Sequence, residues 1–124
     1  IGLNPGIKWQ GEGKLIVEVP NFDDHQIKIN NAYKNWQLQR AHIHYFIPKI
    51  LKNVFSQAGL SVKIIGIQRY SIENLFFWKM NNTPQIKNPK FNLESKYSWI
   101  EKHYKKYLEK KLLSDTIIAI GNLK

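Results

Sequence analysis

The chain has 124 residues, of which 43% are hydrophobic and 23% charged. That length suits one compact domain, and the composition argues against intrinsic disorder. No apolar run approaches the roughly 20 residues of a membrane-spanning helix, and the absence of cysteine excludes disulfides, thiolate zinc sites and a cysteine nucleophile. We expect residues 1–124 to form a single cytoplasmic domain, and a chain that opens with Ile1 suggests a piece of a longer protein.

The formal net charge is +10, from 19 Lys and Arg residues against 9 Asp and Glu residues. Such a surplus predicts attraction to polyanions and a steep dependence on salt. Arg40 and Arg69 are the only arginines, whereas proteins that read nucleic-acid sequence favour the bidentate arginine side chain. We therefore interpret most lysines as solvated surface positions and do not expect nucleic acid as the main partner.

Three short apolar segments have the character of β-strands: residues 14–19, 61–68 and 116–120. The first is apolar at nearly every position, which predicts a strand covered on both faces. Residues 21–40 are polar and lack a clear period, so we expect a long loop with one helical turn near residues 32–36. Adjacent Asp23 and Asp24 fit a turn in this loop better than an acid–base pair.

Two helices are predicted. In residues 48–58, Pro48 suits the first position, Gly59 supplies the left-handed residue past the end, and an apolar stripe runs along one side. Residues 95–112 form the second helix, with its lysines toward water. The stripe of the first helix comprises Ile50, Leu51, Val54, Phe55 and Ala58, and the inward side of the second comprises Tyr97, Ile100, Tyr104, Tyr107, Leu108 and Leu112. Residues 71–94 are irregular and predict an insertion or lid. This alternation belongs to the α/β class.

His42 and His44 flank one apolar residue and would share a face of a strand, where they could bind a metal. With Tyr104 or Tyr107 as a nucleophile, they would fit a metal-dependent nuclease of single-stranded DNA. No acidic third ligand stands nearby, so we favour packed or capping histidines and expect no metal site.

In open α/β sheets ligands bind at the carboxyl ends of strands, which places a site near Asn21 and Arg69.

Several segments together resemble a known arrangement. They are KLIVEVPN at residues 14–21 after the turn Asn4-Pro5-Gly6, RAHIHYFIP at residues 40–48, the helix end Ala58-Gly59-Leu60, and SDTIIAIG at residues 114–121. In this order and spacing they resemble the C-terminal half of a class I S-adenosylmethionine-dependent methyltransferase domain of the small-molecule type.

The resemblance implies a partial Rossmann-like fold. The three predicted strands would be the last three of the sheet, with residues 116–120 inserted antiparallel between the other two. The glycine-rich loop and the acidic residue of the cofactor-binding half are absent from the chain, so we expect it to be inactive alone. The outer edge of residues 14–19 would then be open and apolar, which predicts self-association or a partner that covers it.

The resemblance also implies an activity, the transfer of a methyl group from S-adenosylmethionine to a small molecule. Asn21 and Phe22 would lie near the methionine end of the cofactor, and Arg40, Arg69 and Tyr70 on the substrate side. His42 and His44 would be the catalytic candidates, since the pKa of histidine lies near neutrality. The aromatic residues of the 71–94 insertion would shape the pocket.

The basic charge and the aromatic residues between the lysines leave a second class of function open. In this alternative the chain is a non-catalytic module that binds nucleic acid or an acidic partner. Retention on a polyanion column at moderate salt would favour it, whereas retention at low salt only would indicate diffuse charge.

Overall fold

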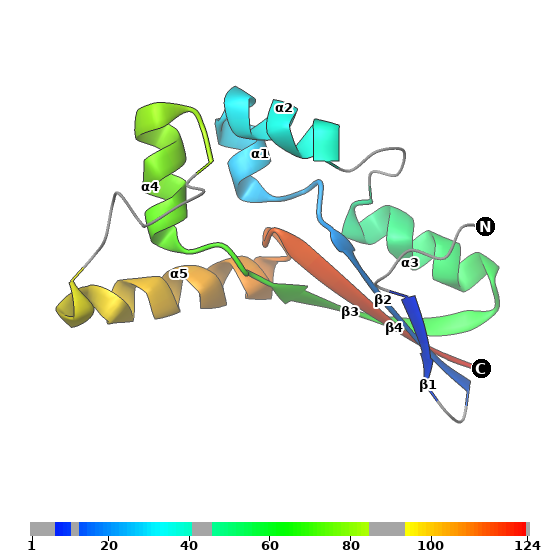
Figure 1. The fold of residues 1–124 in the computed structure, drawn as a ribbon. Helices are drawn as coiled ribbons and strands as arrows, with labels where there is room; N and C mark the ends of the chain where they lie inside the picture. Colours follow the sequence, from blue (N-terminus) through cyan, green and yellow to red (C-terminus); the bar gives the residue numbers. More distant parts are fainter. Residues whose placement is uncertain (1–6, 11–12, 41–45, 85–93, 124) are drawn as a thin grey trace.

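A computed structural model describes residues 7–10, 13–40, 46–84 and 94–123 (Figure 1). They form a mixed α/β fold in which helices flank a four-stranded sheet. The strands are β1 (Ile7–Gln10), β2 (Lys14–Pro20), β3 (Leu60–Ile67) and β4 (Thr116–Leu123). The helices are α1 (His25–Ile29), α2 (Asn31–Arg40), α3 (Pro48–Gln57), α4 (Ile72–Asn81) and α5 (Ser98–Lys111), with the short 3-10 helix η2 (Ser95–Tyr97) before α5.

The strand order is β1-β2-β4-β3, and every neighbouring pair is antiparallel. β2 and β3 therefore run parallel to each other on the two sides of β4. Ala119 is paired with Val17 on one side and with Ile64 on the other, which fixes the register. The expected insertion of the last strand between the other two, antiparallel to both, is confirmed.

The outer edge of β2 is not open as expected. β1 pairs with it from Ile7 opposite Val17 to Gln10 opposite Lys14. The hairpin passes through Gly13, which has a left-handed φ of 79°. The prediction of an open edge over residues 14–19 was wrong for residues 14–17, because residues 7–10 pair with them as a strand. So short a segment has no pattern of its own that would indicate this pairing.

The main core lies on one face of the sheet, under α3. Leu51 and Phe55 of α3 are buried against this face, and the other buried members of the cluster are Val17, Val19, Leu60, Ile117 and Ala119. The helix follows its predicted signals, from Pro48 to the left-handed Gly59. Its apolar stripe is narrower than expected: Ile50 is 45% exposed and Val54 47%, and Ala58 is also exposed. The helix therefore presents only a narrow strip to the sheet.

The opposite face of the sheet carries a row of isoleucines that belongs to neither hydrophobic cluster of the described residues. Each of them is only half-buried, in contrast to Val17 and Val19 on the face under α3. This isoleucine face comprises Ile16, Ile65, Ile67, Ile118 and Ile120. The expectation that residues 14–19 are covered on both faces was therefore wrong.

Residues 25–29 and 31–40 form helices α1 and α2, where a long loop over residues 21–40 with one helical turn was expected. Asp24 Oδ1 accepts the backbone N–H of Gln26 at 2.9 Å and thus caps α1, and Asn30 Oδ1 accepts that of Tyr33 at 3.0 Å in the first turn of α2. The two helices pack through Ile27 and Tyr33 against Trp78 of α4 in a second cluster. The error has a physical cause: polar side chains face inward here, so no apolar stripe marks α2.

Helices α1, α2 and α4 are grouped at one end of the sheet, and α5 runs below α4 (Figure 1). α4 occupies the first part of the predicted insertion and is capped by Ser71, whose Oγ accepts the N–H of Asn74 at 3.1 Å. On α5, Leu108 is buried as expected, but Tyr97 before it and Tyr107 on it are 39% and 59% exposed, contrary to the predicted inward side. Within the described part of the chain, no helix has the length and apolar character needed to cross a membrane.

Candidate functional site

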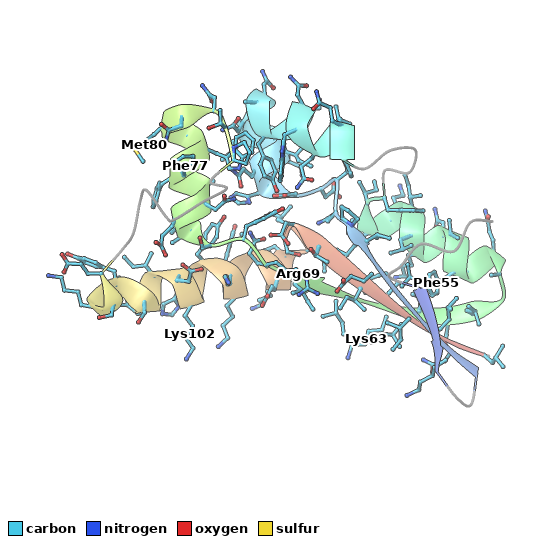
Figure 2. All side chains as sticks on the ribbon, in the orientation of Figure 1. Phe55, Lys63, Arg69, Phe77, Met80 and Lys102 are labelled. Carbon is cyan, nitrogen blue, oxygen red and sulfur yellow. The ribbon has the colours of Figure 1, made fainter. Side chains whose placement is uncertain are left out.

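A pocket of about 330 Å³ lies where β2 and β3 end and β4 begins. This is the edge of the sheet at which the sequence places a site. Arg69, labelled in Figure 2, lies two residues beyond the end of β3 and forms part of the wall. The lining residues are Glu18, Val19, Pro20, Gln37, Arg69, Tyr70, Asp115 and Thr116.

Asp115 organises one side of the pocket. Its carboxylate accepts the backbone N–H groups of Arg69, at 3.1 Å, and Tyr70, at 2.8 Å, and the hydroxyl of Thr116, at 2.8 Å. Burial raises the pKa of Asp115 above its ordinary value, and these donated hydrogen bonds oppose that shift. The carboxylate therefore ties the end of β3 to the start of β4.

Two buried amide side chains complete this junction. Gln68 Oε1 accepts the N–H of Asp115 at 2.9 Å, and Gln68 Nε2 donates to Tyr70 O at 3.1 Å. Asn21 Nδ2 donates to both Leu112 O, at 3.0 Å, and Ser114 O, at 2.8 Å. Because both of its amide hydrogens are used, Asn21 has no donor left for a ligand. It joins the end of β2 to the turn before β4.

A buried polar chain leads from α1 to the pocket. The Tyr33 hydroxyl donates to Asp24 Oδ2 at 2.7 Å and accepts a hydrogen bond from Gln37 Nε2 at 2.8 Å. Gln37 in turn lines the pocket. Burial and the charge of Asp24 raise the pKa of Tyr33 far above its ordinary value. Tyr33 therefore stays a neutral donor that holds α1 and α2 together and orients Gln37.

The open side of the pocket carries opposite charges. The Arg69 guanidinium is paired with the carboxylate of Glu18, and both side chains are partly exposed. A surface pair of this kind adds little stability, so its charges remain available to a polar ligand.

Aromatic rings surround the polar chain. The ring of Tyr33 meets those of Trp78, at 5.3 Å, and Tyr70, at 6.5 Å, edge to face. The ring centroid of Trp36 lies 5.4 Å from that of Trp78 and 6.3 Å from that of Tyr70. Trp78 of α4 is thus buried against α2 and anchors the first part of the predicted lid. Residues 85–93 of that segment lie outside the described residues.

The structure brings together part of the predicted site. Arg69 and Tyr70 line the pocket. Asn21 is buried beside it, and Phe22 packs into the second cluster. Arg40 is the last residue of α2, whereas His42 and His44 lie outside the described residues.

Apart from Arg69 and Tyr70, the residues of the pocket wall were not predicted as site residues from the sequence, and the charged or amide side chains among them are Glu18, Gln37 and Asp115. The capping residues Asp24 and Asn30 were the available signal for the helices that position Gln37. No group of three or more His, Cys, Asp or Glu side chains suited to a metal ion occurs in the described part of the chain.

Comparison with known proteins adds no relative. No protein-family model matches the chain, and neither the curated proteins nor the solved structures include a match.

Proposed function

We propose that this chain is the C-terminal half of an S-adenosylmethionine-dependent methyltransferase domain with a Rossmann-like fold that acts on a small molecule. The observation that supports it is the strand order β2-β4-β3. The last strand, β4, lies between β2 and β3 and is antiparallel to both, so β2 and β3 are parallel to each other. This is the order that the sequence resemblance implies. A pocket at the carboxyl ends of those two parallel strands is in keeping with ligand binding in open α/β sheets.

The isoleucine face also supports a partial sheet. Apolar side chains in a row on a sheet gain free energy when another layer covers them. In the proposed domain, the cofactor-binding half would provide that layer. β1 is a departure, because it occupies part of the edge where the proposal expects a strand of that half.

The described residues do not by themselves fit S-adenosylmethionine. Asn21 has its amide hydrogens committed to two carbonyl groups, and Phe22 is packed in the second cluster. We therefore assign no step of methyl transfer to them. The pocket suits the acceptor instead: Arg69, Glu18 and Gln37 offer charge and hydrogen bonds, and Tyr70 offers a ring. Fixed orientation of the acceptor is the contribution that such groups make to an in-line transfer.

The test uses the gene product translated from its natural start codon. Titration calorimetry with S-adenosylhomocysteine should show saturable binding by that product and much weaker binding by the 124-residue chain. When S-adenosylmethionine carries a radiolabelled methyl group, the full-length gene product should transfer the label to the low-molecular-mass fraction of a deproteinised extract.

A pocket variant separates the acceptor from the cofactor. Arg69→Gln in the natural product should lower labelling while S-adenosylhomocysteine affinity stays unchanged. Lys49→Gln, an exposed change on α3, is the matched control and should alter neither. A natural product that fails to bind S-adenosylhomocysteine contradicts the proposal.

A further inference from the structure

The outer face of α5 carries two parallel rows of side chains, and we propose that this face binds single-stranded nucleic acid. Members of one row lie four residues apart, so they follow each other about 6 Å apart along the helix. Each ring of the second row has a lysine three residues further along the chain, and residues at this spacing are neighbours on the surface of a helix. The lysine row is Lys102, Lys106 and Lys110, and the ring row is Trp99, His103 and Tyr107.

Both rows face solvent. All six side chains are exposed, with Trp99 at 60% and Tyr107 at 59%, while Leu108 on the other side of the helix is buried. Figure 2 shows Lys102 pointing away from the body of the protein. Trp99 and His103 contact each other at 6.2 Å between ring centroids. The rows therefore form a continuous surface that the described core does not use.

The charge of this face is uncompensated. The two carboxylates of α5 have other partners: Glu101 pairs with Lys105 at 3.5 Å, and Glu109 Oε2 accepts the N–H of Gln68 at 2.9 Å. In the part of the chain that the structure describes, no lysine of the lysine row takes part in an ion pair. Three unpaired positive charges in line are complementary to a string of phosphates.

A groove extends the surface toward the sheet. It has a volume of about 460 Å³ and lies between α5 and β3, one of the two edge strands of the described sheet. Lys106, Glu109 and Lys110 of α5 form part of its wall, and Ile64, Ile65 and Gly66 of β3 also line it. A strand lying along α5 would thus have the positive charges of Lys106 and Lys110 along one wall of this groove.

The residue types favour single strands over a duplex. Exposed rings stack on unpaired bases, whereas the bases of a duplex already stack on each other. α5 has no arginine, asparagine or glutamine to read base edges, so binding should be independent of sequence. This activity does not depend on the pocket or on the proposed methyltransferase.

The test measures fluorescence anisotropy of a labelled oligodeoxythymidylate of about 16 nucleotides at several salt concentrations. The chain should bind this oligonucleotide more tightly than a duplex of equal length. Each neutralised phosphate contributes about 0.7 to the slope of log affinity against log salt. Replacement of all three members of the lysine row by glutamine should therefore lower the slope by about 2. Trp99→Ala with Tyr107→Ala should weaken binding about tenfold or more at fixed salt and leave the slope unchanged.

The matched control removes the same charge elsewhere. Lys34, Lys49 and Lys52 are exposed on α2 and α3, and their replacement by glutamine should change the slope little. Circular dichroism verifies that each variant folds. An equal loss of slope in the control, unchanged affinity in the ring variant, or binding to phosphatidylserine vesicles without binding to the oligonucleotide overturns the proposal.

Discussion

The carboxylate of Asp115 accepts the backbone N–H of Tyr70 at 2.8 Å and so fixes the end of β3 to the start of β4. Asp115→Ala leaves the N–H groups of Tyr70 and Arg69 without this acceptor, which costs about 1–3 kcal/mol for each buried donor. We expect the free energy of unfolding to fall by roughly 2–5 kcal/mol, measured by urea denaturation. Thr116→Val removes one hydrogen bond to the same carboxylate and should cost about 1 kcal/mol. Equal effects of the two changes would contradict this role of Asp115.

The buried Tyr33 predicts a loss of stability at alkaline pH. Burial raises the pKa of Tyr33 far above the ordinary value, so the folded protein keeps a proton that the unfolded chain releases above about pH 10. The folded state binds more protons there, and the free energy of unfolding falls as pH rises. Tyr33→Phe should destabilise the protein by about 1–3 kcal/mol at neutral pH, because Asp24 and Gln37 lose their partner.

The sign of the pH effect follows from urea titrations of both proteins at about pH 8 and about pH 11. The stability difference between the wild type and Tyr33→Phe should shrink at the higher pH, since phenylalanine has no proton to lose. Tyr107→Phe, an exposed change, serves as the control. A stability difference that is the same at both pH values would rule out a difference in the pKa of Tyr33 between the folded and the unfolded state.

Tyr104→Phe should not lower the free energy of unfolding, in contrast to Tyr33→Phe. The Tyr104 hydroxyl is buried and has no hydrogen-bond partner among the described residues, although its ring meets His25 edge to face at 5.6 Å. Tyr104→Phe removes an unpaired polar group and leaves the ring in place, so it should be neutral or raise stability by about 1 kcal/mol. Calorimetric melting temperatures report the change. A marked loss of stability would mean that the hydroxyl has a partner in solution.

Gly121 marks the closest approach of α3 to the sheet. A Cβ atom there would lie 2.6 Å from the Phe55 ring and 3.2 Å from Leu60. Gly121→Ala should therefore cost about 1–3 kcal/mol through overpacking, and Phe55→Leu in the same chain should recover part of it. Gly59→Ala is the contrast, since that site has space but a left-handed φ of 81°. Its cost should not respond to Phe55→Leu.

The isoleucine face predicts self-association of the 124-residue chain. Half-buried apolar side chains in a row favour contact with a second copy when no other layer covers them. Ile120→Lys should shift sedimentation toward the monomer, whereas Ile50→Lys on the exposed side of α3 should not. A wild-type chain that sediments only as a monomer would contradict this prediction.

Local signals in the sequence determined several elements. Pro48 and Gly59 bound α3, and the β-branched residues of β3 and β4 leave few alternatives to a strand. Arg69 and Tyr70 could be placed at the site because a strand visibly ends before them. These features depend on neighbouring residues along the chain, so a pattern can reveal them.

Contacts between distant residues decided the rest. β1 is a strand only through its pairing with β2. Tyr33 of α2 is buried because its hydroxyl donates to Asp24 and its ring packs against Trp78, and Gln37 in turn donates to that hydroxyl. Asp115 lines the pocket through backbone groups more than forty positions away. Which face of the sheet is buried and which stays only half-buried also depends on where α3 packs. No local pattern carries this information, because each of these features exists only once the partner is in place.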